Sequence, residues 1–88
     1  MTRVHIPTPL RSYTKEAIVG ADGATVAELC ADLDRRFPGI RFRIIDEQDR
    51  IRRHIKIFVN DRDVPDLAPS LSAGDDVTII CALSGGRR

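Results

Sequence analysis

Alternating apolar and polar residues predict four β-strands along this chain. In each stretch every second side chain is apolar, which places the apolar set on one face of a sheet. The predicted strands cover residues 1–6, 15–19, 54–59 and 77–83. Pro7 and Pro9 end the first strand, because proline cannot donate to a strand ladder. Residues 10–14 are then expected to be a connecting loop, and the first two strands to form an antiparallel hairpin.

A helical period predicts one main helix at residues 26–37. Its apolar residues recur three and four positions apart and form a single stripe: Val26, Leu29, Cys30, Leu33 and Phe37. Thr25 and Glu28 fit a capping box at the start of the helix, and Pro38-Gly39 stops it. At about 1.5 Å per residue, such a helix is long enough to lie across a small sheet.

Two further stretches carry weaker patterns. Residues 40–45 are ambiguous, and one interpretation is a short strand with Phe42 and Ile44 on the same face. Residues 60–76 contain Asn, Asp, Pro and Gly at short intervals, so we expect turns and a loop there.

The order of these elements predicts an α+β fold. A helix between strands favours a crossover that lays the helix on one face of the sheet. The simplest closure is a β-grasp, or ubiquitin-like roll. It has a mixed four- to five-stranded sheet, one main helix across one face, and the last strand parallel to the first. Residues 1–84 would form this domain, and residues 85–88 a flexible Gly-Gly-Arg-Arg tail.

Charge and hydropathy narrow the class of protein. Fourteen basic and 13 acidic residues leave a net charge of +1, which gives no electrostatic footprint for a nucleic-acid partner. No apolar run approaches the ~20 residues of a membrane span. The N-terminus also lacks the apolar core of a signal peptide. We therefore expect a cytoplasmic protein with no membrane partner.

The residues that could carry catalysis are better explained as structural. Cys30 and Cys81 fall in the apolar phase of their elements, which favours core packing over a nucleophile or a redox pair. No Cys/His spacing suggests a zinc site. Neither His5 nor His54 belongs to a Ser or Cys arrangement that would need a general base. We expect no catalytic residue, no metal and no cofactor, so the chain is not predicted to be an enzyme.

The C-terminal end is the unusual part of the sequence. The last strand runs into Gly85-Gly86 and then only Arg87-Arg88. Glycine has no Cβ, so a Gly-Gly end is thin enough to thread a narrow channel, and its carboxylate would be open to attack. This favours a chemical handle. The alternative is a frayed terminus, where small residues and arginines are common.

Several short motifs, taken in order, resemble a known family. They are Ile6-Pro7-Thr8 with Leu10-Arg11, Ala24-Thr25-Val26, residues 55–61, Gly74-Asp75-Asp76-Val77, and Gly85-Gly86. The chain is similar over nearly its whole length to the ubiquitin-like sulfur carriers, the group that contains ThiS and MoaD. Within that group it most resembles the cysteine-biosynthesis carriers.

The resemblance implies a carrier rather than a catalyst. A partner enzyme would adenylate the carboxyl of Gly86 with ATP, reached along the slender Gly85. A sulfur donor would then displace AMP and leave a thiocarboxylate. An acceptor synthase would finally take the sulfur. The resemblance leaves the product open among cysteine, thiamin, molybdopterin, a thiolated tRNA and a secondary metabolite.

The chain departs from the family pattern after Gly86. Such carriers usually end at Gly-Gly, and here Arg87-Arg88 follows, so Gly86 has no free carboxyl as translated. One hypothesis is that a metallopeptidase removes both arginines. Two alternatives remain: a ubiquitin-like modifier joined through Gly86 to lysines of target proteins, and a β-grasp interaction module that is never activated.

A partner surface is predicted from the phase of the strands. Phe58 and Ile80 are out of step with the inward residues of their strands, so both would face away from the helix on neighbouring strands. His5 and Lys56 would form a polar rim, and Leu83 is assigned to the same docking surface. The alternative is that single exposed apolar residues are ordinary.

Overall fold

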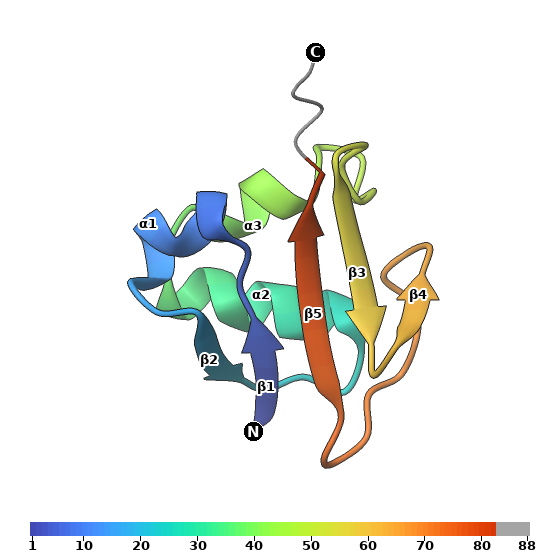
Figure 1. Cartoon of the computed structure of the whole chain (residues 1–88). Helices are drawn as coiled ribbons and strands as arrows, with labels where there is room; N and C mark the ends of the chain where they lie inside the picture. The colour runs from blue at the N-terminus through green and yellow to red at the C-terminus, as the bar shows by residue number, and fades with distance from the viewer. Residues whose placement is uncertain (83–88) are drawn as a thin grey trace.

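Five strands form one mixed sheet in the computed structural model of the chain, which describes residues 1–82. Their order across the sheet is β2-β1-β5-β3-β4 (Figure 1). The strands are β1 (Thr2–His5), β2 (Ile18–Ala21), β3 (Ile55–Val59), β4 (Arg62–Val64) and β5 (Asp76–Cys81). β5 lies in the middle, parallel to β1 and antiparallel to β3. The predicted parallel pairing of the first and last strands is therefore confirmed.

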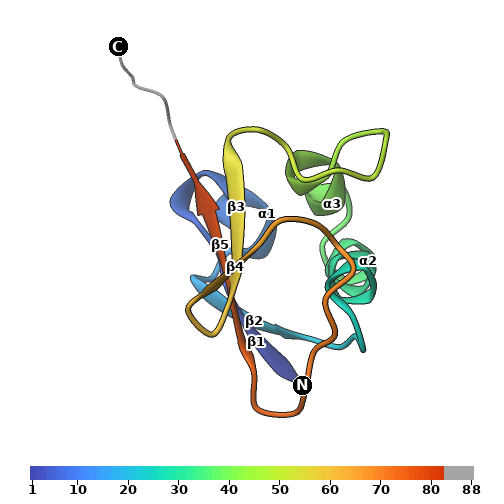
Figure 2. The ribbon, with the colours of Figure 1, turned by 90° about the vertical axis from the view of Figure 1, so that its right-hand side faces the viewer.

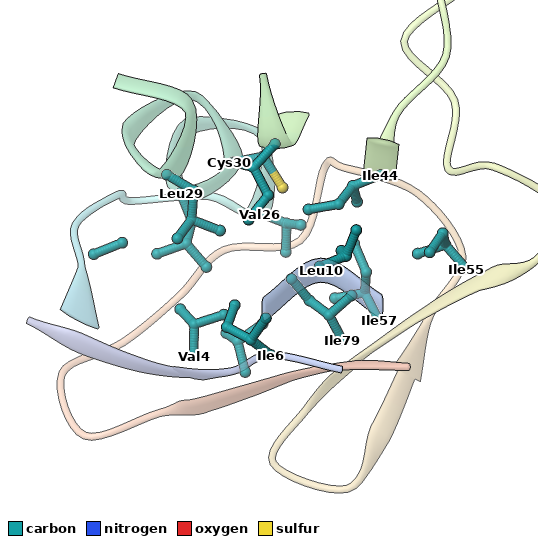
Figure 3. Close-up of a cluster of buried hydrophobic side chains, with 14 of the residues drawn as sticks. Val4, Ile6, Leu10, Val26, Leu29, Cys30, Ile44, Ile55, Ile57 and Ile79 are labelled. Atoms are coloured by element: carbon teal, nitrogen blue, oxygen red, sulfur yellow. The ribbon is translucent and has the colours of Figure 1, made fainter. Parts of the chain in front are cut away.

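The main helix, α2 (Val26–Arg36), packs across one face of this sheet (Figure 2). The predicted apolar stripe is buried as far as Leu33, and Phe37 caps the C-terminal end of the helix half-buried. The stripe meets inward-facing residues in the central strands or directly after β1, as Figure 3 shows: Val4, Ile6, Ile55, Ile57 and Ile79. One contiguous apolar core thus joins the helix to the sheet and holds the central strand in place.

The predicted capping box closes the N-terminus of α2. The hydroxyl of Thr25 accepts a hydrogen bond from the backbone N–H of Glu28 at 3.2 Å. The Glu28 carboxylate reaches back and accepts from the N–H of Ala24 at 3.0 Å. Both side chains therefore satisfy amides that have no partner within the helix.

Residues 40–45 form a helix, so the short-strand interpretation is wrong. This helix, α3 (Ile40–Ile44), has its first and last residues fully buried, the i, i+4 spacing of one helical face. Gly39 supplies the left-handed backbone before it, with φ of 98°. A carboxylate oxygen of Asp34, on α2, accepts from the Gly39 N–H at 3.0 Å and helps to begin the new helix.

The connection between β1 and β2 is helical, although a loop was predicted at residues 10–14. It contains a 3-10 turn, η1 (Thr8–Leu10), and a single helical turn, α1 (Arg11–Thr14). Lys15 ends α1 in the left-handed conformation, with φ of 65°, so the chain cannot yet be extended. The second strand consequently begins at Ile18, three residues later than predicted.

The fifth strand was missed because residues 60–76 were assigned to turns and a loop. β4 pairs antiparallel with β3 through the two-residue turn Asn60-Asp61. Asn60 has a positive φ of 53°, the backbone that tight hairpin turns require and that asparagine tolerates. Val64 ends the strand buried against the core.

The topology is that of the predicted α+β β-grasp roll: a mixed sheet whose last strand lies centrally, with the main helix across one face. Within residues 1–82, none of the helices is long and apolar enough to cross a membrane.

Candidate functional site

The chain leaves the sheet at the end of β5, and this exit is held from one side by β3. Cys81 pairs with Ile55, and the N–H of Ala82 donates to the carbonyl of His54 at 2.7 Å. Helix α3 and the segment that leads into β3 lie at the same end of the molecule as the end of β5 (Figure 1). Five predicted site residues lie outside the described residues: Leu83, Gly85, Gly86, Arg87 and Arg88.

The predicted docking residues lie together on the sheet face opposite α2. Ile80 is 42% exposed and stands opposite Lys56 on β3. Phe58, half-buried, stands opposite Thr78, and Thr78 pairs on its other side with His5 of β1. Residues that face each other across strands share a face of the sheet. These five residues therefore form one surface over three strands, which we call the outer-face patch.

The patch continues beyond the residues predicted from the sequence. Ile18 on β2 stands opposite His5 and is 45% exposed. Its phase was visible in the sequence, because it alternates with the buried Val19. A hollow also adjoins the patch at the root of the tail, where His5, Ile80 and Cys81 contribute to its lining. The apolar surface thus reaches the point where the chain leaves the sheet.

Two ion pairs lie at the edges of the outer-face patch, one of them formed by its own member Lys56. Lys56 pairs with Asp63 on β4 at 3.8 Å, and Arg3 on β1 pairs with Asp76 on β5 at 3.1 Å. The hydrogen bonds from Arg3 lower the pKa of Asp76 below its ordinary value. Exposed pairs of this kind contribute little to stability. They do give the apolar patch the polar border of a protein interface.

The two cysteines differ in their surroundings. Cys30 is 2% exposed within the core, and burial raises the pKa of its thiol to about 11. Because the thiolate is the nucleophile, this cysteine is inert, and its predicted role in core packing is confirmed. Cys81 is only half-buried, at the end of β5. Nowhere in residues 1–82 do three or more His, Cys, Asp or Glu side chains gather into a possible metal site.

Together the fold and the outer face define a class of protein. It is a small β-grasp domain whose central strand leads the C-terminal end out of the sheet beside an apolar patch. The model of the ThiS family matches residues 4–86 of this chain. A curated relative, the sulfur carrier protein CysO of Mycobacterium tuberculosis, is 38% identical over an alignment of 89 positions that covers 94% of this chain and 96% of that protein.

Solved structures agree with this match. A chain of the Amycolatopsis orientalis BexX/CysO complex is 40% identical, with a TM-score of 0.90 over 98% of this chain and 100% of the other. The small archaeal modifier protein SAMP1 of Haloferax volcanii has a TM-score of 0.79 at 23% identity, covering 97% and 98% of the two chains. That likeness shows the fold alone. The chain belongs to the ThiS family of ubiquitin-like sulfur carriers, as its motifs indicated.

Proposed function

We propose that this chain is a sulfur carrier that transports sulfur as a thiocarboxylate on Gly86. The observation that supports this most is where the family match ends. It covers residues 4–86, so it includes both glycines of the Gly-Gly end and stops before Arg87-Arg88. The fold is consistent with this role, because the chain leaves the sheet at the end of its central strand, β5, four residues before Gly85 in sequence.

The chemistry needs a free carboxylate and two displacements. The Gly86 carboxylate attacks the α-phosphate of ATP on a partner enzyme, and pyrophosphate leaves. The acyl adenylate formed is a good electrophile, unlike the carboxylate itself. A hydrosulfide-equivalent donor then attacks the carbonyl carbon and AMP leaves, so Gly86 carries a thiocarboxylate. The carrier supplies the acyl group and the partner supplies the catalysis.

This chemistry requires that Arg87-Arg88 be removed first, since Gly86 otherwise carries a peptide bond. We propose that a metallopeptidase, as in other ubiquitin-like systems, cleaves after Gly86. Cysteine is the product class best supported, because the curated relative is a CysO. A cytoplasmic location fits two unpaired thiols, which an oxidising compartment would put at risk.

The outer-face patch is the proposed docking surface for the activating enzyme, with Leu83 at the start of the tail completing it. Apolar side chains in the middle and ion pairs at the border match the anatomy of a protein interface. The CysO of Amycolatopsis orientalis was solved in a complex with BexX. By analogy this chain would also bind a partner protein, and we propose that a sulfur-accepting synthase is one such partner, after the activating enzyme has released the chain.

Intact-mass spectrometry of the protein from its own host tests this proposal. We expect the loss of both arginines, followed by replacement of one oxygen by sulfur when ATP, a sulfide source and the activating enzyme are present. Two matched chains serve as controls, one ending at Gly86 and one ending at Arg87. Only the first should become activated without a peptidase.

Other outcomes separate the alternatives. Loss of the arginines with ladders of larger conjugates would show a protein modifier, for which the likeness to SAMP1 gives no support beyond the fold. If the chain that ends at Gly86 is not adenylated either, the carrier proposal is wrong and the domain is an interaction module.

A further inference from the structure

A second hollow lies at the root of the tail, on the side of the sheet that carries the helices. It is formed where η1, α3, the segment before β3 and the end of β5 meet. Among its lining residues are Leu10, Phe42, Arg43, Arg52 and His54. It is separate from the outer-face patch, which lies on the opposite face. We call this second site the root hollow.

The root hollow presents an aromatic ring that is exposed and yet fixed. Phe42, on α3, is 58% exposed. The guanidinium of Arg52 lies over the ring, 4.5 Å from its centroid, and its Nε donates to the Phe42 carbonyl at 2.7 Å. Two contacts between one pair of residues hold the ring in place before any partner arrives. Aromatic and arginine side chains that need little ordering are the usual centres of binding energy in interfaces.

Charge is distributed unevenly between the two ends of the molecule. Residues 41–53, at the end where the tail leaves, contain five arginines and three carboxylates. Residues 60–76, which begin beyond β3 and lead into β5, contain one arginine and five aspartates. Figure 1 shows these segments at opposite ends of β3 and β5. The small net charge therefore conceals a strong asymmetry along the length of β3 and β5.

Two of the three carboxylates in residues 41–53 are engaged, and the third, Glu47, lines the root hollow together with the two arginines Arg43 and Arg52. Asp49 pairs with Arg41 at 3.0 Å. Asp46 accepts backbone N–H groups of its own turn, which lowers its pKa. Within residues 1–82, Arg43 of the hollow and the nearby Arg53 have no carboxylate at ion-pair distance. The cationic surplus at the tail end is thus presented to the outside.

We propose that the activating enzyme binds the root hollow with an acidic segment, placing an apolar side chain against Phe42 and a carboxylate on Arg43. This interaction rests on the proposed function and adds a second contact surface to the outer-face patch. An acidic rim around the enzyme's entrance attracts the tail end and repels the aspartate-rich end. The carrier consequently approaches with its C-terminal end first, because complementary charge acts on encounter as well as on the final contact.

The test compares charge reversals at the two ends, measured as association and dissociation rates with the activating enzyme. Arg43→Glu should lower the association rate by about three- to tenfold at low ionic strength, and the difference should shrink as salt is added. Arg62→Glu makes the same change in net charge on exposed β4 at the opposite end and should change the association rate less than about twofold. Phe42→Ala should raise the dissociation rate by about tenfold.

Each outcome decides the proposal. Equal association rates for Arg43→Glu and Arg62→Glu, together with an unchanged dissociation rate for Phe42→Ala, overturn it. Thermal unfolding of each variant confirms that the fold is kept, and Phe42→Leu repeats the test with a side chain that is apolar but cannot stack on the guanidinium. ATP–pyrophosphate exchange with the wild-type chain ending at Gly86 is measured separately. If exchange occurs but the variants bind as the wild type does, only the root-hollow contact is refuted. If no exchange occurs, the carrier function itself is refuted.

Discussion

Ile79 and Ile80 are neighbours on β5 whose side chains point to opposite faces of the sheet. Ile79 is 2% exposed within the core, and Ile80 is 42% exposed on the outer-face patch. Truncation of each residue to alanine should therefore affect different properties. Ile79→Ala should act on stability alone, whereas Ile80→Ala should cost less stability and also weaken partner binding. The chemistry of the two changes is identical, so each variant is the matched control of the other.

The magnitudes follow from the two exposures. Truncation of a buried isoleucine costs about 2–5 kcal/mol, because the lost transfer free energy is added to the cost of the cavity. Complete burial of the side chain contributes about 1.5–3 kcal/mol. Since 42% of Ile80 is still exposed, a partner that covers it can gain about 0.6–1.3 kcal/mol. That corresponds to a loss of about three- to ninefold in affinity for Ile80→Ala. The part of Ile80 already buried should cost about 1–2 kcal/mol of folding stability.

Urea unfolding measures the stability of both variants, and calorimetric titration with the activating enzyme measures affinity at a temperature where both are folded. A stability loss for Ile80→Ala as large as that for Ile79→Ala would mean that Ile80 is a core residue and that the register of β5 is wrong. An unchanged affinity for a well-folded Ile80→Ala would remove the outer-face patch as the docking surface.

Three further predictions concern the body of the domain. Asp32 accepts the N–H of Asp22, which lowers its pKa from 3.8 to about 2. Its stabilising effect is therefore complete above the unfolded pKa and is lost as the pH falls from about 4 through 2, so Asp32→Asn should flatten the acid limb of a pH–stability curve. A maleimide should modify Cys81 first and Cys30 only on unfolding, as mapped by peptide mass, because the Cys30 thiol stays protonated. Thr25→Ala should lower the free energy of unfolding in urea by about 1 kcal/mol, whereas Thr25→Ser should largely preserve it.

The sequence alone predicted an element correctly where that element had a clear hydrophobic period of its own. The stripe of α2 and the alternation in β3 and β5 are each set by burial on a single face, which the order of residues records directly. The parallel pairing of β1 and β5 then followed from the crossover helix. The same reasoning placed Phe58 and Ile80 on the outer face, because residues out of phase with the core face the other side.

The errors occurred where the deciding contact is distant or the element is short. Residues 40–45 read as a strand because an apolar residue stands at every second position, including Phe42. In the structure the Phe42 side chain lies outside the core, and its ring contacts the guanidinium of Arg52, ten residues further on. The carboxylate that helps to begin α3 belongs to Asp34 on α2. β4 has only three residues, so no alternation can be read from it, and its pairing partner β3 decides its conformation.

The chemistry proposed for Gly86 constrains where recognition can take place. Two glycines have no side chains, so they offer a partner little that distinguishes this carrier from another Gly-Gly end. Specificity must then come from the domain near the point where the tail begins. There the fold provides two different surfaces, the apolar outer-face patch on one side of the sheet and the cationic root hollow on the other. A partner that contacts both surfaces would close around the end of β5, which β3 holds in the sheet as far as Cys81. The central position of β5 thus places the point where the chain leaves the sheet between the two surfaces that a partner can recognise.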